Sequence, residues 1–461
     1  VPFGFFGATD AESRAALASG PVRPDRDNFA PGVGFAWSPR PANGLMKTLL
    51  GDGLTAIRGG YRINYDVLFY NILTVNASNY PRVVTLDLQN LYDVFPSRQT
   101  GSAQAVFNPL ATYVNSPEDL SNPMGQAFSL TIQRQLLNDY VLEFGYAGSR
   151  ATNAINQLQA NPGLLAAAQI QTVQQTRNAG SIPALQARRL FPQFGSRVLI
   201  ASTAQSTYNS GFVSLNKRFT QGLLFTTAYT WSKNMSNNDE SLGVGAITAG
   251  SPQVPQDFFN YNAEKSPSAF DRTHRFAASW VYEVPWFKGN WAQGVFKQVL
   301  GGWQYSGVFE VQSGQPFTIL TGVDTNGNGG GGDRPNFNPR GTLTQDPVTG
   351  NLRSFTSARD TGQFIVPVLG ANGLPVANSL GNGTLGKNTL RGEGLMNWNM
   401  SLLKRVKLTE TMNVQLRVDA LNIFNQRFFG NPIGNMNSPD FGRNLNNGGN
   451  RSLTLGAKFA F

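Results

Sequence analysis

The 461-residue chain contains no cysteine and only one histidine. The missing cysteines exclude a disulfide framework, a cysteine zinc site, an iron–sulfur cluster and a thiol nucleophile. The single His274 also excludes metal sites that need several imidazoles. Charged residues make up 14% of the chain, against roughly 25% in a typical soluble domain. Most thiol-dependent and metal-dependent enzyme classes are therefore excluded before any motif is considered.

The sequence also lacks long apolar runs and the common catalytic motifs. No stretch approaches 18 consecutive apolar residues, so no transmembrane helix is expected. There is no nucleophile elbow, no Walker A loop and no zinc-ligand spacing, and we therefore expect no enzymatic activity. The net charge of +10 is spread along the chain without a basic cluster. That distribution favours contact with lipopolysaccharide phosphates or an acidic substrate over nucleic acid.

What the sequence does contain is strict alternation of apolar and polar residues. In the final segment, 451–461, the apolar residues Leu453, Leu455, Ala457, Phe459 and Phe461 fall on one face. We expect Phe459 and Phe461 to act as the membrane-assembly signal for the barrel-assembly machinery. Similar segments recur along the chain, and together they give eleven candidate strands: 30–38, 54–66, 125–136, 140–150, 208–219, 223–234, 270–285, 301–313, 395–407, 411–424 and 451–461.

The connections between these segments alternate between short and long. The tightest turns are Leu137–Asp139, Thr220–Gly222 and Leu408–Glu410. The long connections are 67–124, 151–207, 235–269, 314–394 and 425–450. Tight periplasmic turns and long outer loops are typical of an antiparallel up-and-down transmembrane β-barrel in the bacterial cell outer membrane. The sequence therefore predicts an all-β fold with its long loops on the cell exterior and with outer-membrane lipid and lipopolysaccharide as partners.

Two polar sets identify the expected lumen-facing surface. The first set is Arg58, Arg62 and Asn64, and the second is Asn413, Gln415, Arg417 and Asp419. Such residues could wet a transport path or hydrogen-bond a plug, although they could also simply solvate the interior. Three cations lie instead on otherwise apolar faces, close to the short turns: Arg134, Lys217 and Lys404. We expect their long side chains to reach the lipid headgroups.

One Gly-rich segment imitates the start of a calcium loop. Asp324, Asn326 and Asn328 occupy the first, third and fifth positions, and glycine follows at the sixth. The twelfth position is Pro335 where an EF-hand needs a bidentate glutamate, so Asp333 would have to substitute. A flexible Asn/Gly turn is the alternative. No other cofactor is expected.

Several phrases resemble the carboxyl-terminal barrel of Oar-like TonB-dependent receptors, a group of the acidobacterial and myxobacterial type. The phrases are Asp27–Trp37, Arg58–Tyr61, Glu143–Ser149, Leu215–Phe219, Tyr229–Lys233, Phe270–Phe276, Gln312–Phe317, Leu421–Asn425 and Phe441–Gly442. The resemblance implies a barrel of about 22 strands, of which residues 30–461 would be the carboxyl-terminal half. It also implies movement of a bulky, unidentified substrate across the outer membrane, energised by the TonB complex through amino-terminal parts that are not visible in this sequence.

Strand parity bears on how the chain is organised. Single-chain bacterial barrels have an even number of strands, whereas eleven are found here. We therefore expect residues 1–29 to be the end of an outer loop from a truncated upstream region, with the plug and carboxypeptidase-regulatory-like domain absent. An undetected twelfth strand is the alternative. The isolated portion is expected to form an open or incompletely closed sheet. Two other functions remain open, an adhesin or structural surface barrel without transport and a passive porin.

Overall fold

The computed structural model describes residues 25–68, 109–117, 119–164, 184–239, 254–285, 299–322, 324–338, 340, 363–365, 382–409 and 411–461. Residues 1–24, and with them most of the segment expected to be the end of an outer loop, lie outside the described residues. Within the described residues, no helix is both long and apolar enough to cross a membrane.

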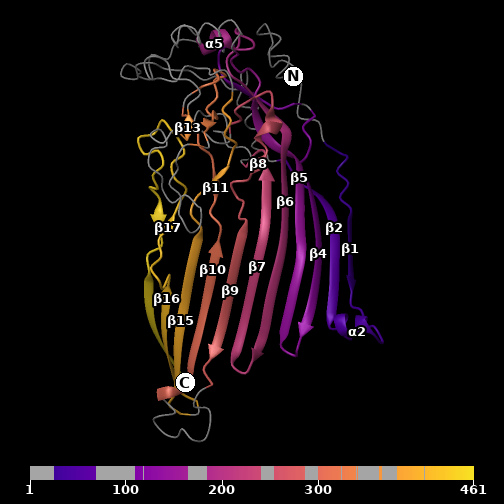
Figure 1. The fold of residues 1–461 in the computed structure, drawn as a ribbon, viewed down its shortest axis with the longest axis vertical. Coiled ribbons are helices and arrows are strands. Elements are labelled where there is room, and N and C mark those ends of the chain that lie inside the picture. The colour runs from indigo at the N-terminus through magenta and orange to yellow at the C-terminus, as the bar shows by residue number, and fades with distance from the viewer. Residues whose placement is uncertain are drawn as a thin grey trace, which may run out of the picture.

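One antiparallel sheet dominates the fold (Figure 1). Its strands follow the order of the chain: β1 (Gly32–Trp37), β2 (Thr55–Tyr65), β4 (Met124–Leu136), β5 (Tyr140–Gln159), β6 (Arg197–Thr220), β7 (Leu223–Ser236), β9 (His274–Glu283), β10 (Trp303–Gln312), β15 (Leu395–Lys407), β16 (Asn413–Leu421) and β19 (Ser452–Ala460). Each of these strands falls on one of the eleven predicted segments. The predicted all-β, up-and-down architecture is therefore confirmed.

Two short strands extend the sheet beside this path. β3 (Tyr113–Asn115) runs parallel to β6, and β8 (Ser266–Pro267) pairs antiparallel with β7. The remaining elements are small. They comprise the helical turns α2 (Leu45–Leu50), α5 (Leu185–Arg188) and η4 (Tyr261–Glu264), and the two-residue strands β11 (Pro316–Phe317), β12 (Asn336–Phe337), β13 (Phe364–Ile365), β14 (Leu390–Arg391), β17 (Phe428–Phe429) and β18 (Asn447–Gly448).

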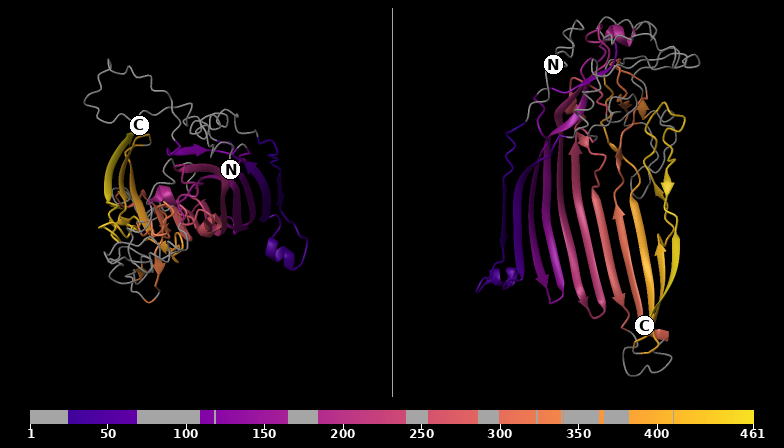
Figure 2. Two further views of the ribbon diagram at one scale, coloured as in Figure 1. Left: turned by 90° about the horizontal axis from the view of Figure 1, so that it is seen from above. Right: turned by 180° about the vertical axis from the view of Figure 1, so that it is seen from behind.

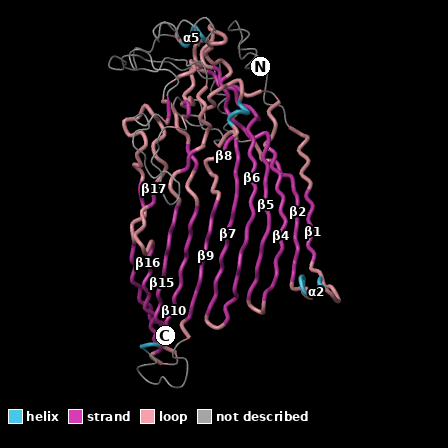
Figure 3. The backbone as a smooth tube through the Cα atoms, in the orientation of Figure 1, coloured by secondary structure: helices cyan, strands magenta, loops and turns pink. Residues whose placement is uncertain are grey.

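The connections emerge as the loop-length pattern predicts (Figures 1 and 3). The described parts of the five long connections gather at one end of the sheet. The tight turns lie at the opposite end, together with the carboxyl terminus and α2. Seen from above, the sheet bends into an arc with β1 and β19 at its two ends (Figure 2). The strand path is open, as expected for the isolated portion.

β5 and β6 run farther than their sequence pattern indicates. The predicted segments are 140–150 and 208–219, whereas the strands span Tyr140–Gln159 and Arg197–Thr220. Their register shifts between Ala151 and Ala154, and Asn153 adopts a left-handed φ of 57°. A bulge of this kind moves later side chains to the opposite face and breaks the period-two pattern. The alternation therefore stops at the bulge, although the pairing continues.

The buried apolar core lies among the loops and at the loop ends of β5 and β6, and not along the rest of the sheet. One cluster consists of Phe317, Ile319, Phe364, Leu385, Met436 and Phe441, and a second of Leu120, Ile155 and Ile200. On the sheet, by contrast, many large apolar side chains are exposed, for example Val33, Phe35, Val213, Trp231 and Leu455. An exposed apolar surface this broad is unsuited to water and fits the hydrocarbon of a membrane.

Rings from neighbouring strands cover several glycines of this exposed face. Phe35 lies against Gly59, Phe128 against Gly148, and Trp280 against Gly307. In each case an added Cβ would clash with the ring. Glycine is thus required here by close cross-strand packing and not by an unusual backbone conformation.

Candidate functional site

The sheet register brings both predicted polar sets to a single face. Arg58 lies opposite Thr131 in the register, and Thr131 lies opposite Gly145. The same side of the sheet continues from there across β6 and β7. The same face continues through Glu310 and Ser401 to Asp419. Arg58, Arg62 and Asn64 therefore share a side of the sheet with Asn413, Gln415, Arg417 and Asp419. The side chains between them on the opposite side are predominantly apolar.

Two ion pairs lie on this polar face, one across strands and one within a strand. Arg275 and Glu310 form an ion pair with a nitrogen–oxygen distance of 2.8 Å. Arg417 Nε donates to Asp419 Oδ1 at 2.7 Å and lies 3.2 Å from Ser401 Oγ. These contacts compensate the charges of Arg275, Glu310, Arg417 and Asp419 within the wall. The sequence identifies Arg417 and Asp419 but not Arg275, Glu310 or Ser401, because cross-strand partners become visible only once the register is known.

The other predicted members of the polar face have simpler surroundings. Arg58 Nη1 donates to Gln133 Oε1 at 2.9 Å, and Gln415 Nε2 donates to Asn413 Oδ1 at 3.3 Å. Arg62 is exposed opposite Gly32 and Ala127, and Asn64 lies opposite Gly125. Both predicted sets are thus partly hydrogen-bonded within the wall and partly exposed, and their lumen-facing role stays a prediction.

The three cations on the apolar face bind backbone carbonyls at the turn end. Lys217 Nζ donates to the carbonyls of Thr220 and Leu223, both at 3.0 Å. Lys404 Nζ donates to the carbonyls of Val299 and Gly301. In the same way, Arg134 Nη2 donates to the Thr48 carbonyl at 3.1 Å. Their position near the short connections is as predicted. In the described structure these side chains are held by carbonyls of the connections, and contact with lipid headgroups stays a prediction.

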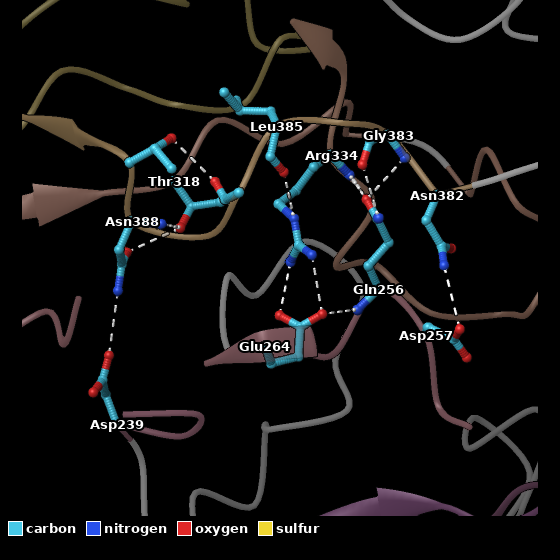
Figure 4. A network of polar contacts seen from close by, with 12 residues as sticks. Asp239, Gln256, Asp257, Glu264, Thr318, Arg334, Asn382, Gly383, Leu385 and Asn388 are labelled. Atoms are coloured by element: carbon cyan, nitrogen blue, oxygen red, sulfur yellow. Dashed lines mark hydrogen bonds and ion pairs between the residues drawn. The ribbon is translucent and has the colours of Figure 1, made fainter. Parts of the chain in front are cut away.

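A buried ion pair organises the loop end of the molecule (Figure 4). Arg334 Nη1 lies 2.7 Å from Glu264 Oε2, and Nη2 lies 3.0 Å from Oε1. The two side chains are only 6% and 3% exposed. Arg334 Nε also donates to the Leu385 carbonyl at 2.9 Å. This bidentate geometry joins the connection before β9 to two separate parts of the connection between β10 and β15.

Gln256 joins the same network, where it contacts Glu264, Arg334 and Gly383 (Figure 4). Its amide N–H donates to Glu264 Oε1 at 3.0 Å, while its side-chain Oε1 accepts from Arg334 N at 2.8 Å and Gly383 N at 3.2 Å. The backbone N–H and the side-chain Oε1 of Gln256 therefore both have hydrogen-bond partners. Buried polar groups satisfied in this way favour one arrangement of the loops.

A second set of contacts ties the same loops to the top of the sheet. Asn388 Nδ2 donates to the Pro267 carbonyl at 2.9 Å and to Asp239 Oδ2 at 3.3 Å. Its backbone N–H donates to Thr318 Oγ1 at 2.9 Å. Arg391 pairs with the fully buried Asp271 just before β9. The loop cluster, defined here as 254–272, 314–338 and 382–394, is thus a packed body above the rim.

The predicted calcium loop closes on itself through hydrogen bonds to its own backbone. Asp333 Oδ2 accepts from Thr325 N at 2.6 Å, and Asp324 Oδ2 accepts from Gly329 N at 2.9 Å. Asn326 Oδ1 accepts from Asn328 N at 3.0 Å, and Asn328 Oδ1 accepts from Gly330 N. These contacts fit the Asn/Gly turn given as the alternative to a metal site. Within the described chain, no group of three or more His, Asp or Glu side chains is arranged to hold a metal. Calcium binding stays a prediction.

Both carboxyl groups of this turn are held away from water. Burial raises the pKa of Asp333 to about 7, and the nearby Asp324 carboxylate adds to that shift. Burial likewise raises the pKa of Asp324, while hydrogen bonds from the Gly329, Gly327 and Asn328 backbone act in the opposite sense. One oxygen of Asp324, Oδ1, is buried without a hydrogen-bond partner. The turn therefore responds to pH near neutrality.

His274 and the carboxyl-terminal aromatics lie on the apolar side. His274 pairs with Trp231 in register, and its Nδ1 lies 2.8 Å from the Tyr229 hydroxyl. It is therefore a structural polar residue at the membrane side and not one that faces the interior. Phe459 lies opposite Val414, and its ring stacks on that of Phe461 with centroids 6.0 Å apart. Both rings are exposed, and their role as a membrane-assembly signal stays a prediction.

Comparison with known proteins agrees with this geometry. Residues 6–454 match the family described as outer membrane beta barrel domain, and the chain belongs to that family. The protein is thus a transmembrane β-barrel protein of the bacterial outer membrane. A search of curated proteins found no match.

Among solved structures, the chain is similar to the outer membrane transporter YddB from Escherichia coli, at 9% identity and a TM-score of 0.44, covering 89% of this chain and 39% of that one. It is also similar to the siderophore receptor PiuA from Acinetobacter baumannii, at 10% identity and a TM-score of 0.39, covering 93% and 35%. A third similar structure is the ferripyoverdine receptor of Pseudomonas aeruginosa, at 8% identity and a TM-score of 0.36, covering 94% and 33%. The chain therefore spans between a third and two fifths of the length of these proteins.

Proposed function

We propose that this chain forms part of the wall and mouth of a TonB-dependent receptor that carries a bulky substrate across the outer membrane. The observation that carries the proposal is the continuous polar face of the sheet, with ion pairs such as Arg275–Glu310, beneath a packed loop cluster. A polar wall whose charges are partly paired lets a polar solute pass without holding it at those pairs. A packed mouth with buried hydrogen bonds presents a fixed surface for selecting that solute. The sequence phrases that resemble Oar-like receptors support the same assignment.

The partners follow from this assignment. TonB would supply energy through parts of the receptor outside the sequence given, and the substrate would meet the loop cluster first. Lipid and lipopolysaccharide would contact the apolar side of the sheet, whose exposed side chains suit hydrocarbon. The exposed rings of Phe459 and Phe461 would present the carboxyl-terminal signal to the barrel-assembly machinery. The receptor performs no chemistry on its substrate in this proposal.

Substrate depletion in living cells tests the proposal. Wild-type cells, cells lacking the gene for this chain and cells lacking TonB would be grown in the same rich medium, and solutes remaining in the medium would be measured by mass spectrometry. We expect at least one large solute to be consumed by the wild type and left by both deletion strains. Dependence on TonB separates energised transport from passive diffusion.

Variants of the wall sharpen the test. The double change Arg275→Gln and Glu310→Gln removes a paired charge from the polar face, and Arg443→Gln with Asp440→Asn removes an exposed pair in a loop as the matched control. We expect only the first variant to alter the uptake rate at unchanged protein level. Consumption that persists without TonB would indicate a porin. If no solute depends on the gene, an adhesin or structural barrel is the better assignment.

A further inference from the structure

The apolar side of the sheet carries a hollow between β4 and β7. It has a volume of about 480 Å³ and is lined mainly by apolar side chains, among them Leu130, Ile132, Phe144, Tyr146, Val213 and Trp231. Ligand pockets usually enclose about 300–1,000 Å³, so the hollow is of useful size. Because it opens on the membrane side of the wall, hydrocarbon is the material that meets it.

Gly211 creates this hollow. It lies in one register row with Tyr146 and Trp231, and an added Cβ would meet no atom within 4 Å. Gly148 in the neighbouring row is covered by the ring of Phe128. The row of Gly211 stays uncovered because the ring of Tyr146 stacks on Phe128 instead, with centroids 5.9 Å apart.

Hydrogen bonds hold the flanking aromatic rings away from the gap. The Tyr146 hydroxyl donates to Asn209 Oδ1 at 2.5 Å, in the next row toward the loop end. The Tyr229 hydroxyl lies 2.8 Å from His274 Nδ1, and the two rings stack with centroids 6.2 Å apart. The hollow is thus maintained by side chains that have other partners.

Two cations stand on the loop side of the hollow. Lys233 lies opposite Asn209, one row above Gly211, and Arg150 lies opposite Thr207, one row farther. Both side chains are exposed, and neither has a hydrogen bond or ion pair in the described part of the chain. The register places no Asp or Glu on this side of β4, β5, β6, β7 or β9. The rim of the hollow is therefore positively charged without compensation.

We propose that this surface is a binding site for one lipopolysaccharide molecule of the outer leaflet. An acyl chain would fill the hollow at Gly211, and Lys233 and Arg150 would bind the lipid A phosphates. Long loops mark the cell-exterior end of an outer-membrane barrel, and lipopolysaccharide is the anionic lipid of that leaflet. The order along the strands, with the apolar hollow first and the cations one and two register rows nearer the loop end, is that of an amphiphile with its phosphates toward the exterior.

Lipid retention and binding test this proposal. The full chain would be purified from outer membranes in mild detergent, and 3-hydroxy fatty acids per protein would be measured by mass spectrometry. Delipidated protein would then be titrated with lipid A and, separately, with phosphatidylglycerol, using native mass spectrometry. We expect about one lipid A per chain and weaker binding of phosphatidylglycerol.

Two independent variants locate the site. Gly211→Leu fills the hollow without backbone strain, and Lys233→Gln with Arg150→Gln removes the rim charge. We expect each to weaken lipid A binding about tenfold. Their matched controls are Gly456→Leu, which also points into open space but from the polar face, and Lys458→Gln, an exposed cation on that same face. The controls should bind as the wild type does.

Several outcomes would overturn the proposal. Unchanged binding by both the hollow-filling and the charge-removing variants would show that lipid A sits elsewhere or only in the detergent belt. Equal affinity for phosphatidylglycerol would show a general anionic-lipid surface. If Gly211→Leu fails to assemble, judged by electrophoretic mobility with and without heating, the charge variant decides alone because its side chains are exposed and make no contacts that assembly requires.

Discussion

The Glu264–Arg334 pair offers a direct test of whether the loop cluster is a rigid body. Replacing Glu264 by Gln keeps the shape of the side chain and removes its charge. Arg334 would then remain as a buried cation, since its side chain is only 6% exposed. The change also weakens the acceptor for the Gln256 amide, which lies 3.0 Å from Glu264 Oε1.

The magnitude follows from burial. Removing one partner of a buried ion pair typically costs about 3–5 kcal/mol, because the other charge is left uncompensated. An exposed pair contributes only about 0–1 kcal/mol, so Asp440→Asn at the exposed Asp440–Arg443 pair serves as the control. Adding Arg334→Met to Glu264→Gln removes the stranded charge. We expect the double variant to regain a large part of the loss.

Hydrogen exchange followed by mass spectrometry measures the effect where it occurs. The amides of Gln256, Arg334 and Leu385 are hydrogen-bonded within the loop cluster and report its opening. A loss of 3 kcal/mol corresponds to about a hundredfold faster exchange at these positions. The strand amides of β9 and β10 should keep their wild-type rates. Unchanged exchange in the loop cluster, or equal acceleration in the strands, would refute the idea of a separately stabilised body.

Three further perturbations address other parts of the structure. Because burial raises the pKa of Asp333 to about 7, its folded state holds a proton that the unfolded chain loses near pH 4. Stability of the turn should therefore fall as pH rises from about 4 to 7, by up to roughly 4 kcal/mol, and Asp333→Asn should reduce this dependence to the part left by the raised pKa of Asp324 in the same exchange assay. Millimolar calcium should flatten the pH profile of the wild type only if the turn binds it, since a bound cation holds the carboxylate ionised. Gly148→Ala places a Cβ against Phe128 and should destabilise the sheet by about 1–3 kcal/mol in urea unfolding, which Gly456→Ala should not. Lys217→Met leaves carbonyls of the β6–β7 turn without a donor and should cost about 1–3 kcal/mol in the same titration; wild-type midpoints would contradict either expectation.

The strands were predictable because a membrane wall imposes one rule on every residue. With lipid on one side and water on the other, each strand must alternate, and all eleven segments do. The alternation stops at the bulge in β5. Beyond Ala151 the chain has left the membrane zone, the bulge at Asn153 moves later side chains to the other face, and partners are set by contacts with β3. Periodicity therefore gives the wall accurately and misses the extensions of β5 and β6.

The loop cluster was not predictable by the same route. Glu264 and Arg334 are 70 residues apart, and Gln256 and Gly383 are 127 apart. Nothing in the local sequence of either partner indicates its distant contact, because an isolated charge in a polar loop reads as a solvated side chain. The polar wall is intermediate: Arg417 and Asp419 stand two residues apart in one strand and were predicted, whereas Arg275 and Glu310 needed the register.

The wall and the loop cluster are therefore stabilised in different ways. The wall has almost no protein core and depends on lipid to cover exposed side chains such as Val213 and Leu455, whereas the loop cluster buries its own core around Ile319 and Leu385. A substitution in one of these two parts should therefore leave the stability of the other part unchanged. Glu264→Gln should loosen the mouth in an intact wall, and Gly148→Ala should weaken the wall while the exchange protection of the mouth persists. An outer-membrane protein built in this way can change its loop surface without changing the part that must assemble in the membrane.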